Sequence, residues 1–181
     1  MNNTNAGKAT SPGWQENEIC CLDVSLNNRY QVGVYLESTV DWINRRFASC
    51  IISLGDTLHR HNLAPVHGAD SAYRLTREMG DCWLREARTA LSRFTIEHKV
   101  IRSDEWLKMP GFDPLHEELW GYYYTHSPFH RIVEDDVEKF TARHQHLDEN
   151  AARKASRAYL MEETAADILL SQSCRTTHLY P

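Results

Sequence analysis

Two short apolar segments, each ending abruptly in small and polar residues, narrow the possible folds more than any other part of the sequence. The first covers Ile19 to Val24 and continues into Ser25, and the second covers Cys50 to Leu54 and continues into Asp56. The segment between them, 34–48, carries apolar residues at helical spacing: Leu36, Val40, Ile43 and Phe47. A strand, a helix and a second strand in this order favour a parallel sheet with a right-handed crossover.

The rest of the chain continues this alternation. A polar segment at 59–70 contains Pro65 and Gly68, which predicts a loop. Ser103 is expected to open a short helix. Further strands are predicted at 99–102 and 176–180, and longer helices at 71–94, 115–124, 129–147 and 150–173. Strands that alternate with helices indicate an α/β domain of three layers. We expect one such domain at 18–181, after a disordered N-terminal tail at 1–17.

The bulk composition limits the class of protein. The net charge of -5 argues against a generally basic coat, although it leaves room for a local basic patch. Five cysteines, an odd number, do not suit a disulfide framework, so we expect a reducing, cytoplasmic location. No apolar run approaches the roughly twenty residues that a membrane span needs, so no membrane partner is expected.

Ser25 lies where chemistry is expected in a parallel sheet. Ligands of such sheets bind beyond the carboxyl ends of the strands, and Ser25 and Asp56 both follow a strand directly. Asp23 precedes Ser25 by two residues, so both side chains face the same side of the sheet. A buried carboxylate is costly without a partner, and a cationic group of a bound substrate would supply one. Asp56 either contributes to this site or fixes the following loop.

Tyr159 and Glu163 form a second candidate pair. They are four residues apart and therefore share one face of the predicted helix. A phenol and a carboxylate held together can grip an ammonium group while passing a proton. This spacing is common, and alone it indicates little.

Taken together, these residues resemble those of the tRNA-dependent cyclodipeptide synthases. The similarity covers most of the segment from Ile19 to Tyr180. The residues that carry it are the block Ser25-Leu26-Asn27-Asn28, Trp42 and Phe47 in the next helix, Asp56-Thr57, Tyr159-x-x-x-Glu163 and the late Tyr180. Their order is far more specific than any one of them.

The resemblance implies a Rossmann-like three-layer sandwich with a mostly parallel sheet, similar to the catalytic domains of class Ic aminoacyl-tRNA synthetases. It also implies ping-pong catalysis with two aminoacyl-tRNAs and no cofactor. The serine of the family takes the first aminoacyl group from its tRNA, a second aminoacyl-tRNA leads to a dipeptidyl-enzyme, and ring closure releases a diketopiperazine. By position, Ser25 is the nucleophile, Asn28 and Glu163 hold the amino group, Tyr159 also relays protons, and Tyr180 lies near the serine.

Asp23 departs from the apolar-selective members of the family, which have small or apolar residues just ahead of the serine. An aspartate here predicts a cationic first substrate, and arginine fits better than lysine because its planar fork matches a carboxylate. This resembles the fungal arginine-containing branch, with arginyl-tRNA as the first partner. By the same resemblance, Ser103 and Asp104 approach this pocket. Asp104 is either a second contact to the guanidinium or the cap of the following helix.

The family binds tRNA through a basic patch on the helix after the second strand. The corresponding arginines here are Arg74, Arg77, Arg85, Arg88 and Arg93. The alternative is an ordinary solvated face, because Glu78, Asp81 and Glu86 are interspersed among them.

Two other functions compete with this reading. One is a non-catalytic Rossmann-like module that binds charged tRNA or a nucleotide, and the other is a small serine hydrolase of aminoacyl esters. A binding module has no need for the aligned set Asp23, Ser25, Tyr159 and Glu163, and a hydrolase would release free amino acid. Histidines in the 59–67 loop suggest zinc, but loop spacing alone shows no convergent ligands, so no metal is expected. A monomer and a homodimer both remain open.

Overall fold

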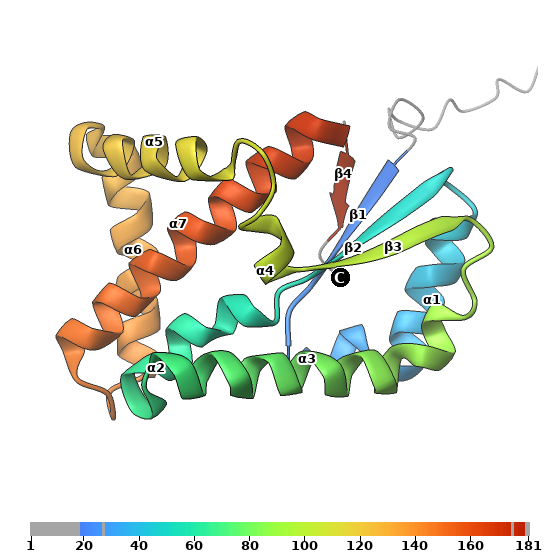
Figure 1. The fold of residues 1–181 in the computed structure, drawn as a ribbon, viewed down its shortest axis with the longest axis horizontal. Helices are drawn as coiled ribbons and strands as arrows, with labels where there is room; N and C mark the ends of the chain where they lie inside the picture. Colours follow the sequence, from blue (N-terminus) through green and yellow to red (C-terminus); the bar gives the residue numbers. More distant parts are fainter. Residues whose placement is uncertain (1–18, 27, 175, 180–181) are drawn as a thin grey trace, which may run out of the picture.

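The computed structural model describes residues 19–26, 28–174 and 176–179. The expected tail at 1–17 and the site residue Tyr180 lie outside the described residues. Four parallel strands form one sheet in the order β3-β2-β1-β4 (Figure 1). Their bounds are β1 Ile19–Val24, β2 Ser49–Leu54, β3 Glu97–Arg102 and β4 Thr176–Leu179.

Helices α1 (Gly33–Asn44) and α3 (Ala69–Leu91) cover one face of the sheet. Every second residue of β1 points to this side, where Cys20, Leu22 and Val24 are buried. The apolar stripes of the two helices pack on them, with these side chains: Leu36, Val40, Ile43, Trp83, Ala87 and Ala90. This half of the core fixes the strand–helix–strand unit that the sequence predicts.

The opposite face is covered by α4 (Ser103–Trp106), α5 (Phe112–Thr125) and α7 (Glu149–Cys174), with α6 (Ser127–Arg143) packed against α5 and α7. Cys21 of β1 is buried on this side, together with Trp106 and Met161. The odd-numbered residues of β1 face this side, so Asp23 and Ser25 look toward α7. The three-layer α/β architecture with a parallel sheet is confirmed. None of the described helices combines the length and apolarity that crossing a bilayer requires.

The prediction of a loop at 59–70 is wrong. A short 3₁₀ turn, Thr57–His59, leads into α2 (Arg60–His67), which contains Pro65. Arg60 and His61 bind the buried carboxylate of Glu162 in α7, so tertiary contacts stabilise a polar helix that sequence patterning does not reveal. The helix ends two residues after the proline at Gly68, whose φ of 75° suits glycine.

Candidate active site

A buried glutamine, Gln31, holds the backbone at the end of strand β1, at Asp23 and Ser25. Along β1, the described residues of β4 pair with residues 19–22. Farther along, the side chain of Gln31, which is 0% exposed, binds the backbone of β1 and of Ser25. Its side-chain Oε1 accepts a hydrogen bond from the Ser25 N–H at 2.8 Å, and its Nε2 donates to the Asp23 carbonyl at 2.6 Å. Trp83 in turn donates from Nε1 to the Gln31 carbonyl at 3.0 Å. The Ser25 backbone is therefore fixed from the side of the core.

Ser25 borders a cavity of about 320 Å³ between the carboxyl ends of β1 and β2 and helix α7. We call it the acidic cavity because three carboxylates line it. The lining residues are Asp23, Val24, Ser25, Ser53, Gly55, Leu58, Trp106, Tyr159, Glu163 and Asp167. Among the described residues of this lining there is no Lys, Arg or His. A cavity of this size and charge suits one amino acid that carries a positive group.

Glu163 has an unusual acidity in this cavity. Burial raises the pKa of its carboxyl to about 7, and the negative charges of Asp167 and Asp23 act in the same direction. The Tyr159 hydroxyl donates a hydrogen bond to Glu163 at 3.3 Å, which opposes the shift only in part. At neutral pH both the protonated and the ionised form of Glu163 are therefore populated, which suits proton transfer.

A second, larger cavity of about 740 Å³ adjoins the first. Ser25 and Tyr159 line both, so they stand at the junction. The wall of the larger cavity comes from the end of β1, α2, α6 and α7. It carries Arg143 and Lys139, of which Lys139 is ion-paired with Asp136 of the same wall. The site thus offers one small acidic cavity and one larger cavity with charges of both signs, and Ser25 borders both.

His59 forms part of the same wall. Its ring lies edge-on to that of Tyr159, with centroids 5.9 Å apart, and burial lowers its pKa. The imidazole is therefore mainly neutral at pH 7 and adds no positive charge beside Tyr159.

The structure brings four of the expected site residues together: Asp23, Ser25, Tyr159 and Glu163 all line the acidic cavity. Asn28 is not among them. Its side chain accepts a hydrogen bond from the Tyr30 N–H and so caps the 3₁₀ turn Arg29–Gln31. Asn28 lines a separate cavity against α3, beside Met79 and Trp83, so the expectation that it shares the amino group with Glu163 is not supported by its position.

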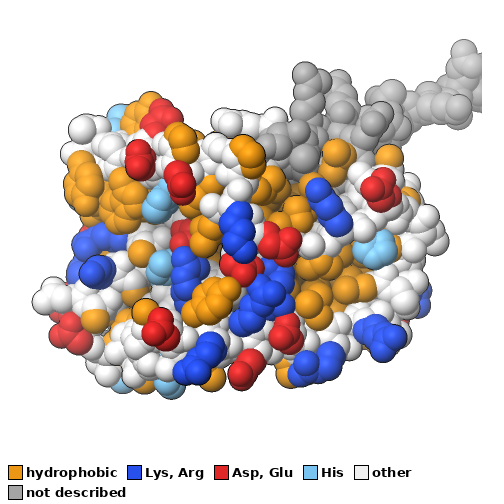
Figure 2. Space-filling model, viewed as in Figure 1, with side chains coloured by type: hydrophobic (Ala, Val, Ile, Leu, Met, Phe, Trp, Pro, Cys, Tyr) orange, Lys and Arg blue, Asp and Glu red, His pale blue; other side chains and the backbone are white. Residues whose placement is uncertain are grey.

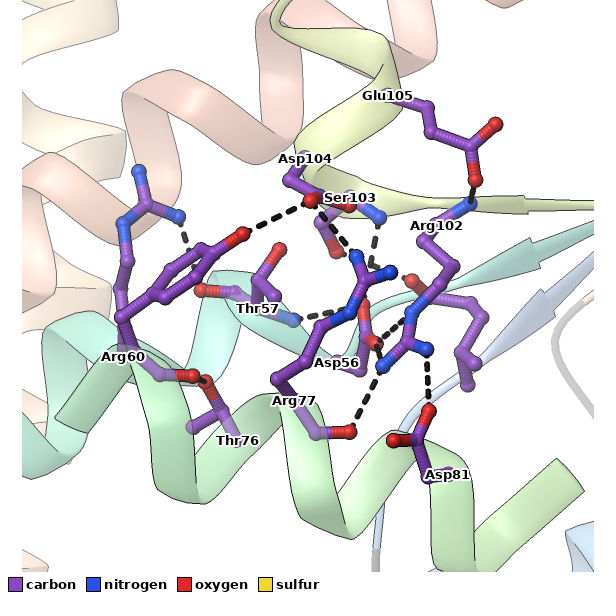
Figure 3. Close-up of polar contacts among 12 residues, drawn as sticks. Asp56, Thr57, Arg60, Thr76, Arg77, Asp81, Arg102, Ser103, Asp104 and Glu105 are labelled. Carbon is purple, nitrogen blue, oxygen red and sulfur yellow. Dashed lines mark hydrogen bonds and ion pairs between the residues drawn. The ribbon is translucent and has the colours of Figure 1, made fainter. Parts of the chain in front are cut away.

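Asp56 and Ser103 do not line the acidic cavity, so their positions do not support the expected role in substrate binding. The contacts of Asp56 fit its other expected role, which is to fix the following loop. Asp56 is 0% exposed and forms an ion pair with Arg102, while its Oδ1 accepts from the Thr57 N–H at 2.7 Å (Figure 3). Ser103 is buried and donates from Oγ to the Leu54 carbonyl at 3.0 Å. Arg102 also binds Asp81 of α3. The group is structural, since it ties the ends of β2 and β3 to α3.

Asp104 fits neither of its two expected roles. It lies inside the first turn of α4, where Arg102 is the N-cap residue. Its Oδ2 accepts a hydrogen bond from Arg77 at 2.7 Å (Figure 3). It also accepts one from Tyr73 at 2.9 Å, and both donors belong to α3. The side chain therefore joins α4 to α3 and does not line the acidic cavity.

The arginines expected to bind tRNA divide into two groups. Arg74, Arg85 and Arg88 are exposed on α3. Arg77 is held by Asp104. Arg93 lies beyond the end of α3, which stops at Leu91, and pairs with acidic residues of α1: Asp41 and Glu37. In Figure 2 basic side chains are interleaved with acidic ones along this face.

Sequence reasoning missed Gln31, Asp167 and Glu162. Asp167 follows Glu163 by one helical turn, a spacing that was visible in the sequence. Gln31 gave no signal, because only the fold brings its amide to the end of β1. Glu162 is buried and anchors α7 to α2: Arg60 donates to it at 2.8 Å, and His61 is 2.9 Å away. Burial favours a raised pKa for Glu162, but these contacts outweigh it and the net shift is downward.

No protein-family model matches the sequence, and a search of curated proteins finds no match. Solved structures do match. A cyclodipeptide synthase from Fluoribacter dumoffii superimposes with a TM-score of 0.85 at 22% identity, covering 91% of this chain and 76% of that one. AlbC, a cyclodipeptide synthase from Streptomyces noursei, gives 0.70 at 17% identity, with 91% and 82% covered.

A third match is a Mycobacterium tuberculosis protein whose structure relates cyclodipeptide synthetases to type I tRNA synthetases. It gives a TM-score of 0.67 at 15% identity, covering 84% of this chain and 67% of that one. These similarities extend over most of the chain. The chain therefore has the fold of the solved cyclodipeptide synthases.

Proposed function

We propose that this chain is a tRNA-dependent cyclodipeptide synthase in which Ser25 carries the first aminoacyl group. The observation that carries the proposal is the shared position of Ser25 and Tyr159, which line both the acidic cavity and the larger cavity. A hydroxyl at such a junction can hold one amino acid while a second approaches from the other side. The fold, shared with solved cyclodipeptide synthases, supports the same assignment.

The reaction needs three acyl transfers. First, Ser25 Oγ attacks the ester carbon of one aminoacyl-tRNA, and the terminal ribose oxygen leaves with the hydroxyl proton. Second, the amine of the serine-bound residue attacks the ester carbon of another aminoacyl-tRNA, and the second ribose oxygen leaves. Third, the amine of the newly added residue attacks the serine ester, which closes the ring and restores the Ser25 hydroxyl. Both esters arrive activated, so the protein chiefly orients and desolvates the reactants.

Glu163 and Tyr159 suit the proton transfers that these steps require. An amine attacks only in its neutral form, so the ammonium must first lose a proton. A carboxylate with a pKa of about 7 can hold the ammonium and then accept that proton at neutral pH. Tyr159, hydrogen-bonded to Glu163 and bordering both cavities, connects this carboxylate with the junction.

We further propose arginine as the first amino acid and arginyl-tRNA as its donor. Asp23 lines the acidic cavity beside Ser25, and charge-assisted hydrogen bonds from a guanidinium would compensate its charge. For the tRNA itself, the exposed Arg74, Arg85 and Arg88 of α3 offer phosphate contacts.

The test is incubation of the purified protein with arginyl-tRNA and a mixture of other charged tRNAs, followed by mass spectrometry. We expect an arginine-containing diketopiperazine from the wild type. Ser25→Ala should form neither the product nor a covalent aminoacyl-enzyme, while the control Ser38→Ala, an exposed serine of α1, should match the wild type. Release of free arginine alone would identify a hydrolase instead. Full product formation by Ser25→Ala would refute the mechanism.

A further inference from the structure

Three carboxylates from two elements converge in the acidic cavity, and they do so in a definite order. Helix α7 runs antiparallel to β1, since it leads into β4, which is parallel to β1 (Figure 1). Moving along α7 from Tyr159 to Glu163 to Asp167 therefore follows the same direction as moving back along β1 from Ser25 to Asp23. Tyr159 and Ser25 lie at the junction with the larger cavity, and Asp167 lies farthest from it along α7.

This order matches the layout of an aminoacyl group. With the ester at Ser25 and the ammonium at the Tyr159–Glu163 pair, the side chain of the amino acid points toward Asp167. One helical turn separates Glu163 from Asp167, a rise of about 6 Å. An extended arginine side chain covers a similar length between its α-carbon and its guanidinium. The head group then reaches a place between Asp167 on α7 and Asp23 on β1.

The charges of the cavity are close enough to affect one another. After burial, the negative charge of Asp167 is the strongest influence that raises the pKa of Glu163, and Asp23 adds to it. The described residues nevertheless contain no group of three His, Cys, Asp or Glu side chains arranged to hold a metal ion. The spacing suits an extended cation that has two separate positive or donor groups, one at each end.

Trp106 supplies an independent observation. It is 4% exposed and lines the acidic cavity, and its Nε1 has no hydrogen-bond partner among the described residues. A buried indole donor without an acceptor is costly. The carbonyl oxygen of a bound aminoacyl group would supply that acceptor. The indole ring also offers a surface on which a guanidinium can stack.

We propose that Asp167 is the second carboxylate of a guanidinium subsite, paired with Asp23 across the acidic cavity, and that it determines the choice of arginine over neutral amino acids. This inference rests on the proposed function and names a residue that the sequence did not single out. One carboxylate can be satisfied by lysine, whereas two carboxylates from different elements match the several donors of the planar guanidinium fork.

The test measures covalent aminoacyl-enzyme formation in single turnovers with arginyl-, lysyl-, glutaminyl- and leucyl-tRNA. Asp167→Asn should lower kcat/KM for arginyl-tRNA by about 10–100-fold, because hydrogen bonds to a charged group are lost. Its kcat/KM for the neutral glutaminyl and leucyl groups should stay equal or rise. The control Asp135→Asn, an exposed aspartate of α6, should retain the wild-type preference.

A second measurement needs no variant. Arginine amide should inhibit the wild-type first half-reaction more strongly than citrulline amide, which has nearly the same shape without the charge. Equal inhibition by the two amides would overturn the subsite, even if Asp167→Asn failed to fold. Unchanged use of arginyl-tRNA by a folded Asp167→Asn would overturn the role of Asp167 alone. Absence of any aminoacyl-enzyme in the wild type with all four tRNAs would instead refute the proposed function.

Discussion

Glu163 lies in an environment that strongly changes the acidity of its carboxyl group. In the folded protein its pKa is raised from 4.5 to about 7 by burial and by two neighbouring carboxylates. A carboxylate must be ionised to hold an ammonium group, so substrate capture and the acidity of this one group are linked.

We expect kcat/KM of the first half-reaction to rise with pH up to about pH 7 and then to level off. Below the pKa the ionised fraction of Glu163 grows about tenfold per pH unit. Glu163→Gln should have a low and flat profile, because an amide does not titrate in this range. The control Glu117→Gln, exposed on α5, should keep the wild-type profile. A wild-type profile that stays flat from pH 5 to 8 would contradict this role.

The same shift predicts an effect on stability. The folded state binds the proton more tightly than the unfolded state, so the contribution of Glu163 to stability falls as the pH rises from 4.5 to 7. Glu163→Gln lacks this loss, and its free energy of unfolding at pH 8 should exceed that of the wild type by up to roughly 3 kcal/mol. Urea unfolding at pH 5 and pH 8 measures the difference, which should be far smaller at pH 5.

Gln31 is a positioning residue, since it acts on Ser25 through the backbone. Gln31→Leu leaves the Ser25 N–H and the Asp23 carbonyl without their partner. We expect kcat to fall about 10–100-fold with KM little changed, together with a stability loss of about 2–4 kcal/mol from two buried groups. The exposed Gln145→Leu is the control. A rise in KM with unchanged kcat would instead assign Gln31 to substrate binding.

At the scale of elements, the buried ion pair of Asp56 and Arg102 requires a close approach of α3. A Cβ at Gly80 would lie 2.3 Å from Asp56 Oδ2 and 2.7 Å from Arg102 Nη2. The helix can pass the ends of β2 and β3 only because this position has no side chain.

Gly80→Ala should therefore destabilise the protein by about 1–3 kcal/mol, as overpacking does, although alanine is the better helix former. Gly121 of α5 provides a matched control, because nothing lies within 4 Å of a Cβ built there. Gly121→Ala should stabilise by about 0.5–1 kcal/mol. Thermal and urea unfolding of the two variants measure the loss of stability in the one and the gain in the other. Equal effects of the two substitutions would show that the close approach does not matter.

The elements also show what sequence alone can predict. Strand β1 was predicted to the residue at Ile19–Val24, because its apolar run ends sharply at a serine. Helix α2 was missed, because its stability comes from Glu162, far away in the sequence. Strand alternation paired Asp23 with Ser25, and helical spacing paired Tyr159 with Glu163, whereas the meeting of the two pairs was expected only from the family resemblance. The pairing of Asp56 with Arg102 depends on a contact between distant elements, which periodicity does not encode. The capping role of Asn28 is local, in a short 3₁₀ turn that the sequence analysis did not predict.

At the scale of the whole molecule, acidic residues outnumber basic ones, and the net charge is -5. An RNA partner must therefore be attracted locally. Arg74, Arg85 and Arg88 share one side of α3 with the ion-paired Arg77 and Asp81, since they recur at spacings of three and four.

Binding of tRNA should weaken linearly in a plot of log affinity against log salt concentration. The double variant Arg85→Gln/Arg88→Gln should bind more weakly at low salt and reduce that slope by about 1.5, the value for two phosphate contacts. The double variant Arg45→Gln/Arg131→Gln removes the same charge from exposed positions on α1's end and α6, and it serves as the control. Identical slopes for both double variants would show that these arginines of α3 form an ordinary solvated face and do not bind tRNA.

The pairing of β4 with β1 joins the latest strand of the described chain to the earliest. Ser25 emerges early during translation, whereas Tyr159 and Glu163 are among the last described residues to leave the ribosome. A nascent chain that has only its first strands cannot assemble the chamber around the nucleophile, because long-range parallel pairing forms slowly and late. For the synthase proposed above, unfinished copies of the chain would therefore leave charged tRNAs to protein synthesis.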